Sequence, residues 1–353
     1  MKKRFLALLL ALMMLLPMGC AAQPPAEKAE PMRDYTDDAG RTVSLPTDID
    51  AILPSGPLAQ MVLLALAPET LAGLASRWPE SAGDYLPAAV FDLPYYGQLY
   101  QSADLNAEEA AAVGAALFLD MGERKASLGD DLDMFTKKTG IPAVYLEATL
   151  AGLPEAIERL GVLLGREEKA AELAGFCRTV YDRAEKVMAQ VGERRVRALY
   201  LGGEDGLSVQ ARGAYHAEVF DMLTENAAEI DAPSSRGTGN VVTMDQIMLW
   251  EPEVLVFAPG SVFDAVEDDP LWQAVPAVAA GRYVQTPAGP YGWLGTPPSV
   301  QRYLGLIWLP AVLYPDVCDY DVQAEITEFY RLFYGCALTQ AQYDALTAGA
   351  FLR

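Results

Sequence analysis

The sequence has few of the residues that metal centres and many catalytic sites require. It contains a single histidine, His216, and four cysteines, none of which form a CxxC pair. A protein-built zinc site is therefore not expected, because such sites gather several His or Cys ligands at short spacing. A P-loop, a dinucleotide-binding glycine pattern and a nucleophile elbow are missing as well. Together these absences argue against an enzyme.

Basic residues are also scarce. The chain has 26 Lys and Arg against 48 Asp and Glu, which gives a formal net charge of -22. Such a field repels the phosphates of nucleic acids, which proteins normally bind through basic patches. No nucleic-acid partner is therefore expected, and the acidic balance suits a solute carrier outside the cytoplasm.

Long apolar runs are limited to the N-terminus. The opening "MKKRFLALLLALMMLLPMGC" places three cations before an apolar run that ends at Gly19 and Cys20. This pattern predicts a secretion signal over residues 1–20. A small residue directly before a cysteine resembles the bacterial lipobox, although Pro17 stands where a leucine is usual. We expect lipidation of Cys20; the alternative is an ordinary signal peptide that contains a cysteine.

Residues 21–34 are rich in Pro, Ala and Glu and have no apolar period. Such a composition predicts a flexible tether. No second apolar run is long enough to span a membrane, so we expect a folded body outside the cytoplasm, anchored to the cell membrane by its N-terminal lipid. The remaining length is sufficient for two domains with cores of their own.

The body alternates predicted strands with predicted helices. "DDAGRTVSLP" has the turn chemistry of a hairpin, "DIDAILPSGP" and "LAGLAS" contain short strands, and "LAQMVLLALA" is helical. Alternation of this kind predicts an α/β fold with mainly parallel sheets.

Two distant segments follow the same plan. Glu108 opens a helix nine residues before the apolar strand that begins at Leu117, and Asp245 stands nine residues before the strand that begins at Val254. Each strand is followed by a further strand that a glycine introduces. We interpret the two segments as parts of two similar Rossmann-like lobes, with chance similarity between amphipathic segments as the alternative.

Residues 153–192 separate these segments and contain one long predicted helix. From about Glu167 to Val191, apolar residues recur at helical spacing with charges on the other face. Such a helix spans nearly 40 Å at about 1.5 Å per residue, enough to join two lobes. The predicted boundaries are 35–152 for the N-terminal lobe, 153–192 for the connecting helices and 193–353 for the C-terminal lobe. Because a helix resists bending, the lobes should close only slightly around a ligand.

In this arrangement the chain resembles the helix-linked (class III) substrate-binding proteins of bacterial ABC importers, the family that captures ferric siderophores, haem and cobalamin. The resemblance covers nearly everything after the tether. It depends on "DDAGRTVSLP", on the segments around Glu108 and Asp245, and on the ending "GWLGTPPSVQRYLGLIWLPAVLYPD".

The resemblance implies a function as well as a fold. It implies a lipid-anchored binding protein without an intrinsic cofactor, a cleft between the lobes, and an ABC permease dimer with its ATPase subunits as the partner. An iron siderophore or a related metal complex is the expected ligand. Haem, a corrinoid or an oxyanion such as molybdate are the alternatives, and a chelatase-like enzyme is an alternative of another class.

The resemblance also assigns a docking role to two acids. In this family one acidic residue near the start of a surface helix on each lobe meets arginines of the permease. Matching the motifs residue by residue gives this role to Glu108 and Asp245, where Asp is shorter than the more usual Glu. The alternative is that each acid only stabilises the N-terminus of its helix.

The candidate ligand-binding residues come from loops rich in aromatic and basic residues. Aromatic rings offer flat surfaces to a chelate, and Arg offers a planar donor fork to anionic oxygens. The candidates are Arg77, Trp78, Tyr95, Tyr96, Tyr215, His216, Arg236, Tyr291 and Trp293. Trp293, in the Gly- and Pro-rich loop "GPYGWLGTPP", is expected to stack on the ligand. The alternatives are aromatics packed in the core and solvated arginines.

His216 and the cysteines are the remaining candidates for special chemistry. His216 is a possible ligand to the metal of a bound complex, and the alternative is a residue that starts a helix or donates a hydrogen bond. Cys177 lies on an apolar helical stripe and is expected to be a buried thiol. Cys318 and Cys336 are candidates for a disulfide in an oxidising compartment.

Overall fold

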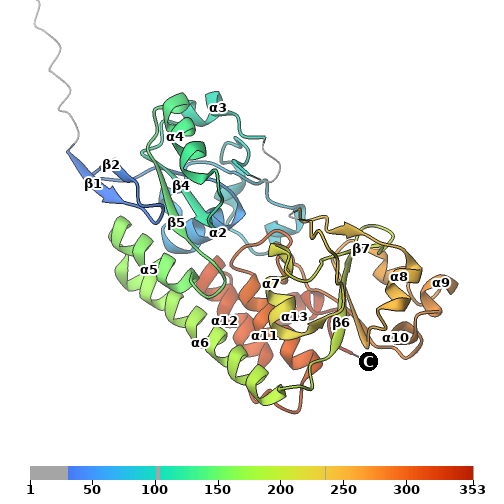
Figure 1. The fold of residues 1–353 in the computed structure, drawn as a ribbon. Helices are drawn as coiled ribbons and strands as arrows, with labels where there is room; N and C mark the ends of the chain where they lie inside the picture. Colours follow the sequence, from blue (N-terminus) through green and yellow to red (C-terminus); the bar gives the residue numbers. More distant parts are fainter. Residues whose placement is uncertain (1–30, 101–103, 235, 353) are drawn as a thin grey trace, which may run out of the picture.

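A computed structural model describes residues 31–100, 104–234 and 236–352. It has two α/β lobes joined by long helices (Figure 1). The expected signal peptide, Cys20 and most of the expected tether lie outside the described residues. Within those residues, no helix combines the length and apolarity needed to cross a membrane.

The first described element is the expected hairpin. Strands β1 (Met32–Thr36) and β2 (Thr42–Pro46) pair antiparallel. Gly40 adopts a φ of 79° in the turn, which a residue without a Cβ accepts most easily. The strand β1 begins inside the segment predicted as tether, because its first residues find partners along β2.

The N-terminal lobe is built on a parallel sheet with strand order β3-β4-β5. Its strands are β3 (Ile52–Pro54), β4 (Leu117–Gly122) and β5 (Ala143–Glu147). Its helices are α2 (Pro57–Leu66), α3 (Ala107–Val113) and α4 (Leu128–Thr139), with 3-10 turns at Pro68–Thr70, Glu80–Asp84 and Ala88–Phe91. The strand predicted in "LAGLAS" is reduced to isolated bridges at Leu71 and Leu74.

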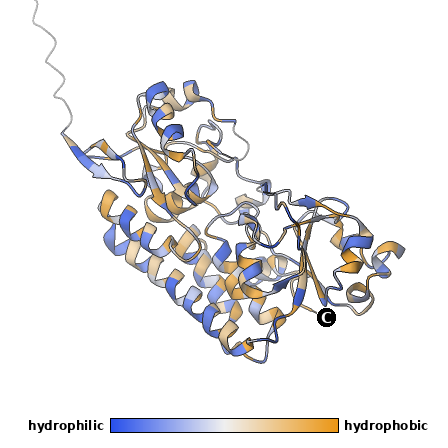
Figure 2. Cartoon of the chain, in the orientation of Figure 1, coloured by the Kyte–Doolittle hydropathy of each residue, from blue (hydrophilic) through white to orange (hydrophobic). Residues whose placement is uncertain are grey.

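Two helices connect the lobes. The helix α5 (Leu153–Leu164) ends at Gly165, which has a φ of 64°, and α6 (Glu167–Val191) then runs for 25 residues along one side of the molecule (Figure 1). The bounds of α6 coincide with those of the predicted long helix. Both helices bury one apolar face and leave the other to solvent, a two-sided pattern that Figure 2 shows.

The C-terminal lobe contains a six-stranded sheet with the order β11-β10-β6-β7-β9, in which β8 also pairs with β6. The strands are β6 (Arg197–Gly202), β7 (Ser208–Val209), β8 (Glu225–Asn226), β9 (Asn240–Val241), β10 (Val254–Phe257) and β11 (Tyr283–Gln285). The helices up to β11 are α7 (Glu218–Leu223), α8 (Met244–Leu249), α9 (Pro270–Gln273) and α10 (Pro276–Ala279), with 3-10 turns at Tyr215–Ala217 and Val262–Ala265.

The shared plan predicted for the two lobes is present in this fold. In the first lobe the order is α3, β4, α4 and β5; in the second it is α8, β10, the short helices α9 and α10, and β11. In both lobes the strands of this unit pair in parallel.

The last helices return to the first lobe. They are α11 (Arg302–Leu313), α12 (Val322–Tyr334) and α13 (Gln340–Leu346). The helix α11 packs on α6, whereas α12 packs on α2, whose residues are all buried. The rings of Tyr85 and Tyr330 meet edge to face at 5.2 Å between centroids. The chain end, predicted as part of the C-terminal lobe over residues 193–353, thus also packs against the N-terminal lobe.

The cysteines of the described residues are thiols. Cys177 is buried in α6, as predicted. Cys318 and Cys336 are both partly exposed and free, so the disulfide considered for them is not present.

Candidate ligand-binding cleft

A cavity of about 630 Å³ lies between the lobes. The N-terminal lobe contributes the loop from β3 into α2, the end of β4 and the loop after it. The C-terminal lobe contributes Tyr215, His216, Arg236 and Gly237. The carboxyl ends of β3 and β4 open into this cavity, which is where parallel α/β sheets usually bind their ligands.

The N-terminal wall carries most of the charge of the cavity. Glu123, Arg124 and Lys125 follow β4 directly and all line the cavity. The ammonium of Lys125 lies 3.9 Å from the centre of the Tyr100 ring, another lining residue, in a cation–π contact. This wall therefore offers carboxylate, guanidinium and ammonium groups within one short loop.

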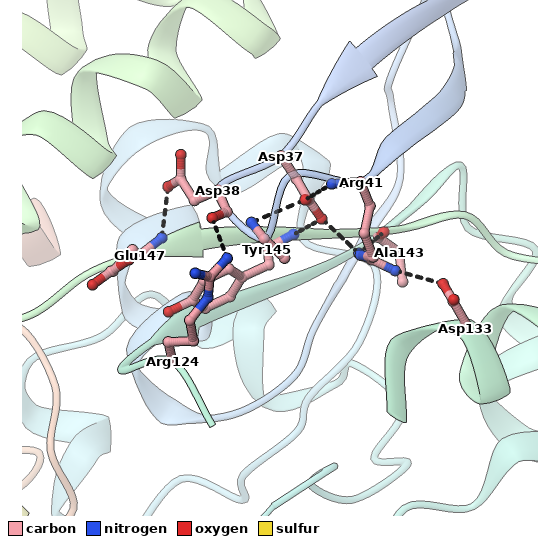
Figure 3. Close-up of polar contacts among 9 residues, drawn as sticks. Asp37, Asp38, Arg41, Arg124, Asp133, Ala143, Tyr145 and Glu147 are labelled. Carbon is pink, nitrogen blue, oxygen red and sulfur yellow. Dashed lines mark hydrogen bonds and ion pairs between the residues drawn. The ribbon is translucent and has the colours of Figure 1, made fainter. Parts of the chain in front are cut away.

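The hairpin turn holds this loop in place. The Asp37 carboxylate accepts hydrogen bonds from the Arg41 guanidinium and from the backbone amide of Tyr145 in β5, at 3.3 Å for the amide. The backbone carbonyl of Asp38 in turn accepts a 2.8 Å bond from Nη2 of Arg124 (Figure 3). The motif "DDAGR" thus joins the hairpin to the sheet through hydrogen bonds, and it positions Arg124, which lines the cavity.

Asp120 is a buried acid in the wall of the cavity. It lies in β4, is 1% exposed, and accepts a hydrogen bond from the Ser55 hydroxyl through Oδ1. Its Oδ2 has no hydrogen-bond partner among the described residues. Burial raises the pKa of this carboxyl, and the Lys125 ammonium and the Ser55 hydroxyl oppose that rise.

The opposite wall presents His216 and Tyr215, at the start of the helical segment that leads into α7. His216 is 2% exposed, and its Nδ1 lies 2.8 Å from the carbonyl oxygen of Gly295. Since a carbonyl oxygen only accepts, Nδ1 carries the proton of this bond. The ring is therefore fixed to the loop before α11 while it faces the cavity.

An ion pair with one fully buried partner lies beside Tyr215. The side chain of Arg302, at the start of α11, is 1% exposed and pairs with Glu218 at the start of α7. The Arg302 guanidinium also lies 5.3 Å from the centre of the Tyr215 ring. Glu218 accepts a 3.3 Å bond from the amide of Leu150 in the N-terminal lobe, so the pair contacts both lobes.

A second cavity of about 510 Å³ adjoins the first at Gly237. Its lining contains no charged residue; glycines, prolines, Tyr200, Gln210 and Tyr291 are prominent in it. The ring of Tyr291 stacks on Trp78 with 6.2 Å between centroids. Burial raises the pKa of the Tyr291 hydroxyl to about 12, which keeps it neutral. The cleft thus has a charged chamber and an uncharged one.

Comparison with known proteins agrees with this two-lobed geometry. Residues 127–290 match the family described as periplasmic binding protein. An ABC transporter solute binding protein from Sulfurospirillum deleyianum superimposes with a TM-score of 0.81 at 23% identity, over 90% of this chain and 99% of that one. The fold is that of the periplasmic binding proteins. The expected resemblance to helix-linked binding proteins and the α/β class with two joined lobes are confirmed.

Two further structures have the same periplasmic binding protein fold. A periplasmic solute binding protein from Veillonella parvula gives a TM-score of 0.73 at 22% identity, over 91% of this chain and 98% of that one. MolA of Haemophilus influenzae, bound to molybdate, gives 0.69 at 18% identity, over 87% of this chain and 99% of that one. No curated protein sequence matches the chain.

Several predicted ligand-binding residues lie at this cleft. Tyr215, His216 and Arg236 line the charged chamber, and Tyr291 lines the uncharged one. Trp78 reaches the cleft only through its stacking on Tyr291.

Other predicted residues lie elsewhere. The Arg77 guanidinium stacks 4.0 Å above the Tyr95 ring, and neither residue lines either chamber. Tyr96 is 1% exposed and donates its hydroxyl proton to the carbonyl of Pro54, so its prediction as a ligand contact is corrected to a core role.

The position of Trp293 differs most from its prediction. It is 0% exposed, and its ring packs edge to face on Trp308 at 6.3 Å between centroids. A Cβ on Gly305 would lie 2.5 Å from the carbonyl oxygen of Trp293, so the absence of a side chain there lets the loop pack directly on α11. The prediction that Trp293 stacks on the ligand is therefore wrong, because the loop turns this ring into the core.

Asp120, Glu218 and Arg302 lie at the site, although no motif in the sequence singled them out. The signal for Asp120 was present: an acid within the apolar run "LFLDMG" has few reasons to be buried. The Glu218–Arg302 pair had no such signal, since its residues are 84 apart in sequence.

Proposed function

We propose that the protein is the extracytoplasmic substrate-binding component of an ABC importer, and that it captures an iron siderophore or a related metal complex in the cleft. The observation that carries this proposal is the charged chamber of about 630 Å³, whose walls come from both lobes. Ligand pockets for small organic molecules have roughly this size, about 300 to 1,000 Å³.

The size of the chamber favours a chelate over a bare oxyanion. The similar structure of MolA is bound to molybdate, an ion far smaller than this chamber. The second, uncharged chamber adds further room next to the first. A metal complex with an organic ligand fills such a space, whereas haem and a corrinoid remain candidates on size alone.

A binding role requires no catalytic group. Among the described residues, no group of three His, Cys, Asp or Glu side chains is placed to hold a metal ion. The metal of a complex would therefore arrive with its own ligands, as cargo. His216 faces the chamber and is the one histidine in the sequence.

Docking to a permease dimer is proposed for Glu108 and Asp245. Both are exposed near the starts of α3 and α8, two helices that lie on the side of the molecule away from α5 and α6 (Figure 1). Val241 and Leu249, 89% and 80% exposed, stand four residues before and four residues after Asp245 in the sequence. An exposed acid flanked in sequence by exposed apolar residues suits a protein partner with matching positive charge.

Anchoring through Cys20 is proposed from the sequence alone, because this residue lies outside the described part of the chain. Mass spectrometry of the protein extracted from membranes tests it. We expect a diacylglyceryl group on Cys20 at the mature N-terminus; an unmodified N-terminus beyond Cys20 would exclude the anchor.

Native mass spectrometry with metal analysis of the freshly purified protein tests the proposed function. We expect one metal complex per chain, released intact on denaturation. Incubation with a ferric siderophore should give stoichiometric capture without chemical change. Conversion of the complex would instead support the chelatase-like enzyme, and failure to retain any of the proposed ligand classes would refute the binding role.

A further inference from the structure

One oxygen of the buried Asp120 side chain lacks a hydrogen-bond partner among the described residues. Buried polar atoms in folded proteins almost always have a hydrogen-bond partner, so an exception calls for a reason. Asp120 is 1% exposed and lines the charged chamber, and its Oδ2 has no partner among the described residues. The Lys125 ammonium contacts the Tyr100 ring and its charge opposes the rise that burial causes in the pKa of Asp120, but Oδ2 receives no hydrogen bond from the described residues.

The rest of the side chain is fixed. The Ser55 hydroxyl donates to Oδ1 from the loop between β3 and α2. Asp120 itself sits opposite Tyr145 in the register of β4 and β5, at the centre of the sheet. A side chain held in this way keeps its buried second oxygen at one place beside the chamber that Asp120 lines, which is how a recognition group must be presented.

The same chamber also holds cationic side chains. Arg124, Lys125 and Arg236 line it from both lobes. A ligand that satisfies all of these groups carries anionic oxygens for the cations and, on the same molecule, an N–H or O–H donor for the Asp120 carboxylate. A bare oxyanion such as molybdate has no such donor at neutral pH, and its oxygens would face Oδ2 acceptor to acceptor.

We propose that the charged chamber selects anionic metal chelates whose organic part retains an N–H or O–H group, and that Asp120 Oδ2 accepts a hydrogen bond from this group. This inference rests on the proposed function and narrows the ligand to amino- or hydroxy-bearing chelates. Asp120 is then a specificity-determining residue.

Two matched probes test the inference on the full chain by calorimetric titration. Cobalt(III) bis(iminodiacetate) and cobalt(III) bis(N-methyliminodiacetate) are inert, carry the same negative charge and differ in a coordinated N–H against N–CH₃. We expect the native chain to prefer the N–H complex by at least about ten-fold, the scale of one charge-assisted hydrogen bond. Molybdate, as the third probe, should bind more weakly than the N–H complex.

Variants separate the hydrogen bond from a simple size effect. Asp120→Ala and Asp120→Asn should both lose the preference between the two cobalt complexes. Glu109→Gln is the control, because it removes a carboxylate from the same lobe at an exposed position that lines neither chamber, and it should keep the preference. Thermal melts give a second readout: Asp120→Asn should leave the melting temperature of the ligand-free chain nearly unchanged, since its amide oxygen can still accept the Ser55 bond and the replaced oxygen has no partner among the described residues.

The outcomes are distinct. Equal affinity of the native chain for the two cobalt complexes, tighter binding of molybdate, or a preference that survives in the Asp120 variants overturns the inference and leaves the binding role intact. A lower melting temperature of Asp120→Asn with an unchanged preference also overturns it, because Asp120 would then serve folding. If none of the three probes binds, the inference fails, and ferric siderophore capture decides the proposed function separately.

Discussion

At the scale of single residues, the Glu218–Arg302 pair shows how a buried charge is kept near a binding cleft. The Arg302 side chain is 1% exposed and that of Glu218 is 31% exposed. Removing one partner of such a pair leaves a charge that neither water nor a counter-ion compensates. The loss of either partner should therefore destabilise the folded protein, because the remaining charge would lack its counter-ion.

We expect Glu218→Gln to lower the free energy of unfolding by about 3 kcal/mol, because it leaves the Arg302 guanidinium buried without its counter-ion. Urea denaturation measures this loss. Glu229→Gln is the control: Glu229 pairs with Arg212 at the surface, with side chains 65% and 43% exposed. Its loss should stay below about 1 kcal/mol. Equal losses in the two variants would contradict the argument.

Trp293 allows a second prediction at this scale. Trp293→Ala should lower the free energy of unfolding by about 3 to 5 kcal/mol, since it empties a fully buried site against Trp308. Ligand affinity, measured by titration below the melting temperature, should stay nearly unchanged. Trp78→Ala, beside Tyr291 at the second chamber, is the comparison and should cost less stability. A variant of Trp293 that folds normally but loses affinity would restore the ligand-stacking hypothesis.

At the scale of elements, the contact between α5 and α6 depends on one glycine. A Cβ on Gly161 would lie 2.3 Å from the Cβ of Ala170, far inside van der Waals contact. Gly175, in the middle of α6, has no such neighbour among the described residues: a Cβ there meets nothing within 4 Å. The two glycines occupy neighbouring helices and have opposite surroundings.

Gly161→Ala should destabilise the protein by about 1 to 3 kcal/mol, because α5 must move away from α6 to accept the methyl group. Gly175→Ala should stabilise it by about 0.5 to 1 kcal/mol, since alanine loses less backbone entropy in a helix. Thermal and chemical denaturation of the two variants checks both signs. A gain of stability from Gly161→Ala would mean that the helices are packed less closely than described.

Helices and strands were the features that the sequence predicted best. The long helix was predicted to both of its ends because its apolar period continues for 25 residues, and the hairpin because its turn chemistry is local. The cleft was only partly predictable. Loop composition correctly indicated that Tyr215, His216 and Arg236 lie at the cleft. It does not indicate which side of a loop faces the ligand. For Trp293 the side is determined by close packing of its backbone on Gly305, a contact that no sequence periodicity predicts.

At the scale of the whole molecule, the two lobes should present Glu108 and Asp245 together to a permease. Glu108→Arg combined with Asp245→Arg should abolish uptake of the ligand in cells, because two attractions become repulsions. Affinity in solution should stay nearly unchanged, since neither residue lines a chamber. Uptake of labelled ligand and titration of the purified variant measure the two effects.

A matched double variant controls for charge alone. Glu168→Arg with Glu185→Arg changes the net charge equally at exposed positions of α6, away from α3 and α8 (Figure 1). It should transport normally. Normal transport by the Glu108 and Asp245 double variant, or equal loss in both double variants, would contradict the docking assignment.

The return of the chain end to the first lobe has a practical consequence. The lobes are linked once by α6 and again where α12 packs on α2, so their separation is nearly fixed. A pair of fluorescent dyes, one on each lobe, would therefore change its energy transfer very little when a ligand binds. A single polarity-sensitive dye at the exposed position 123, on the edge of the charged chamber, would instead report the exchange of water for ligand directly.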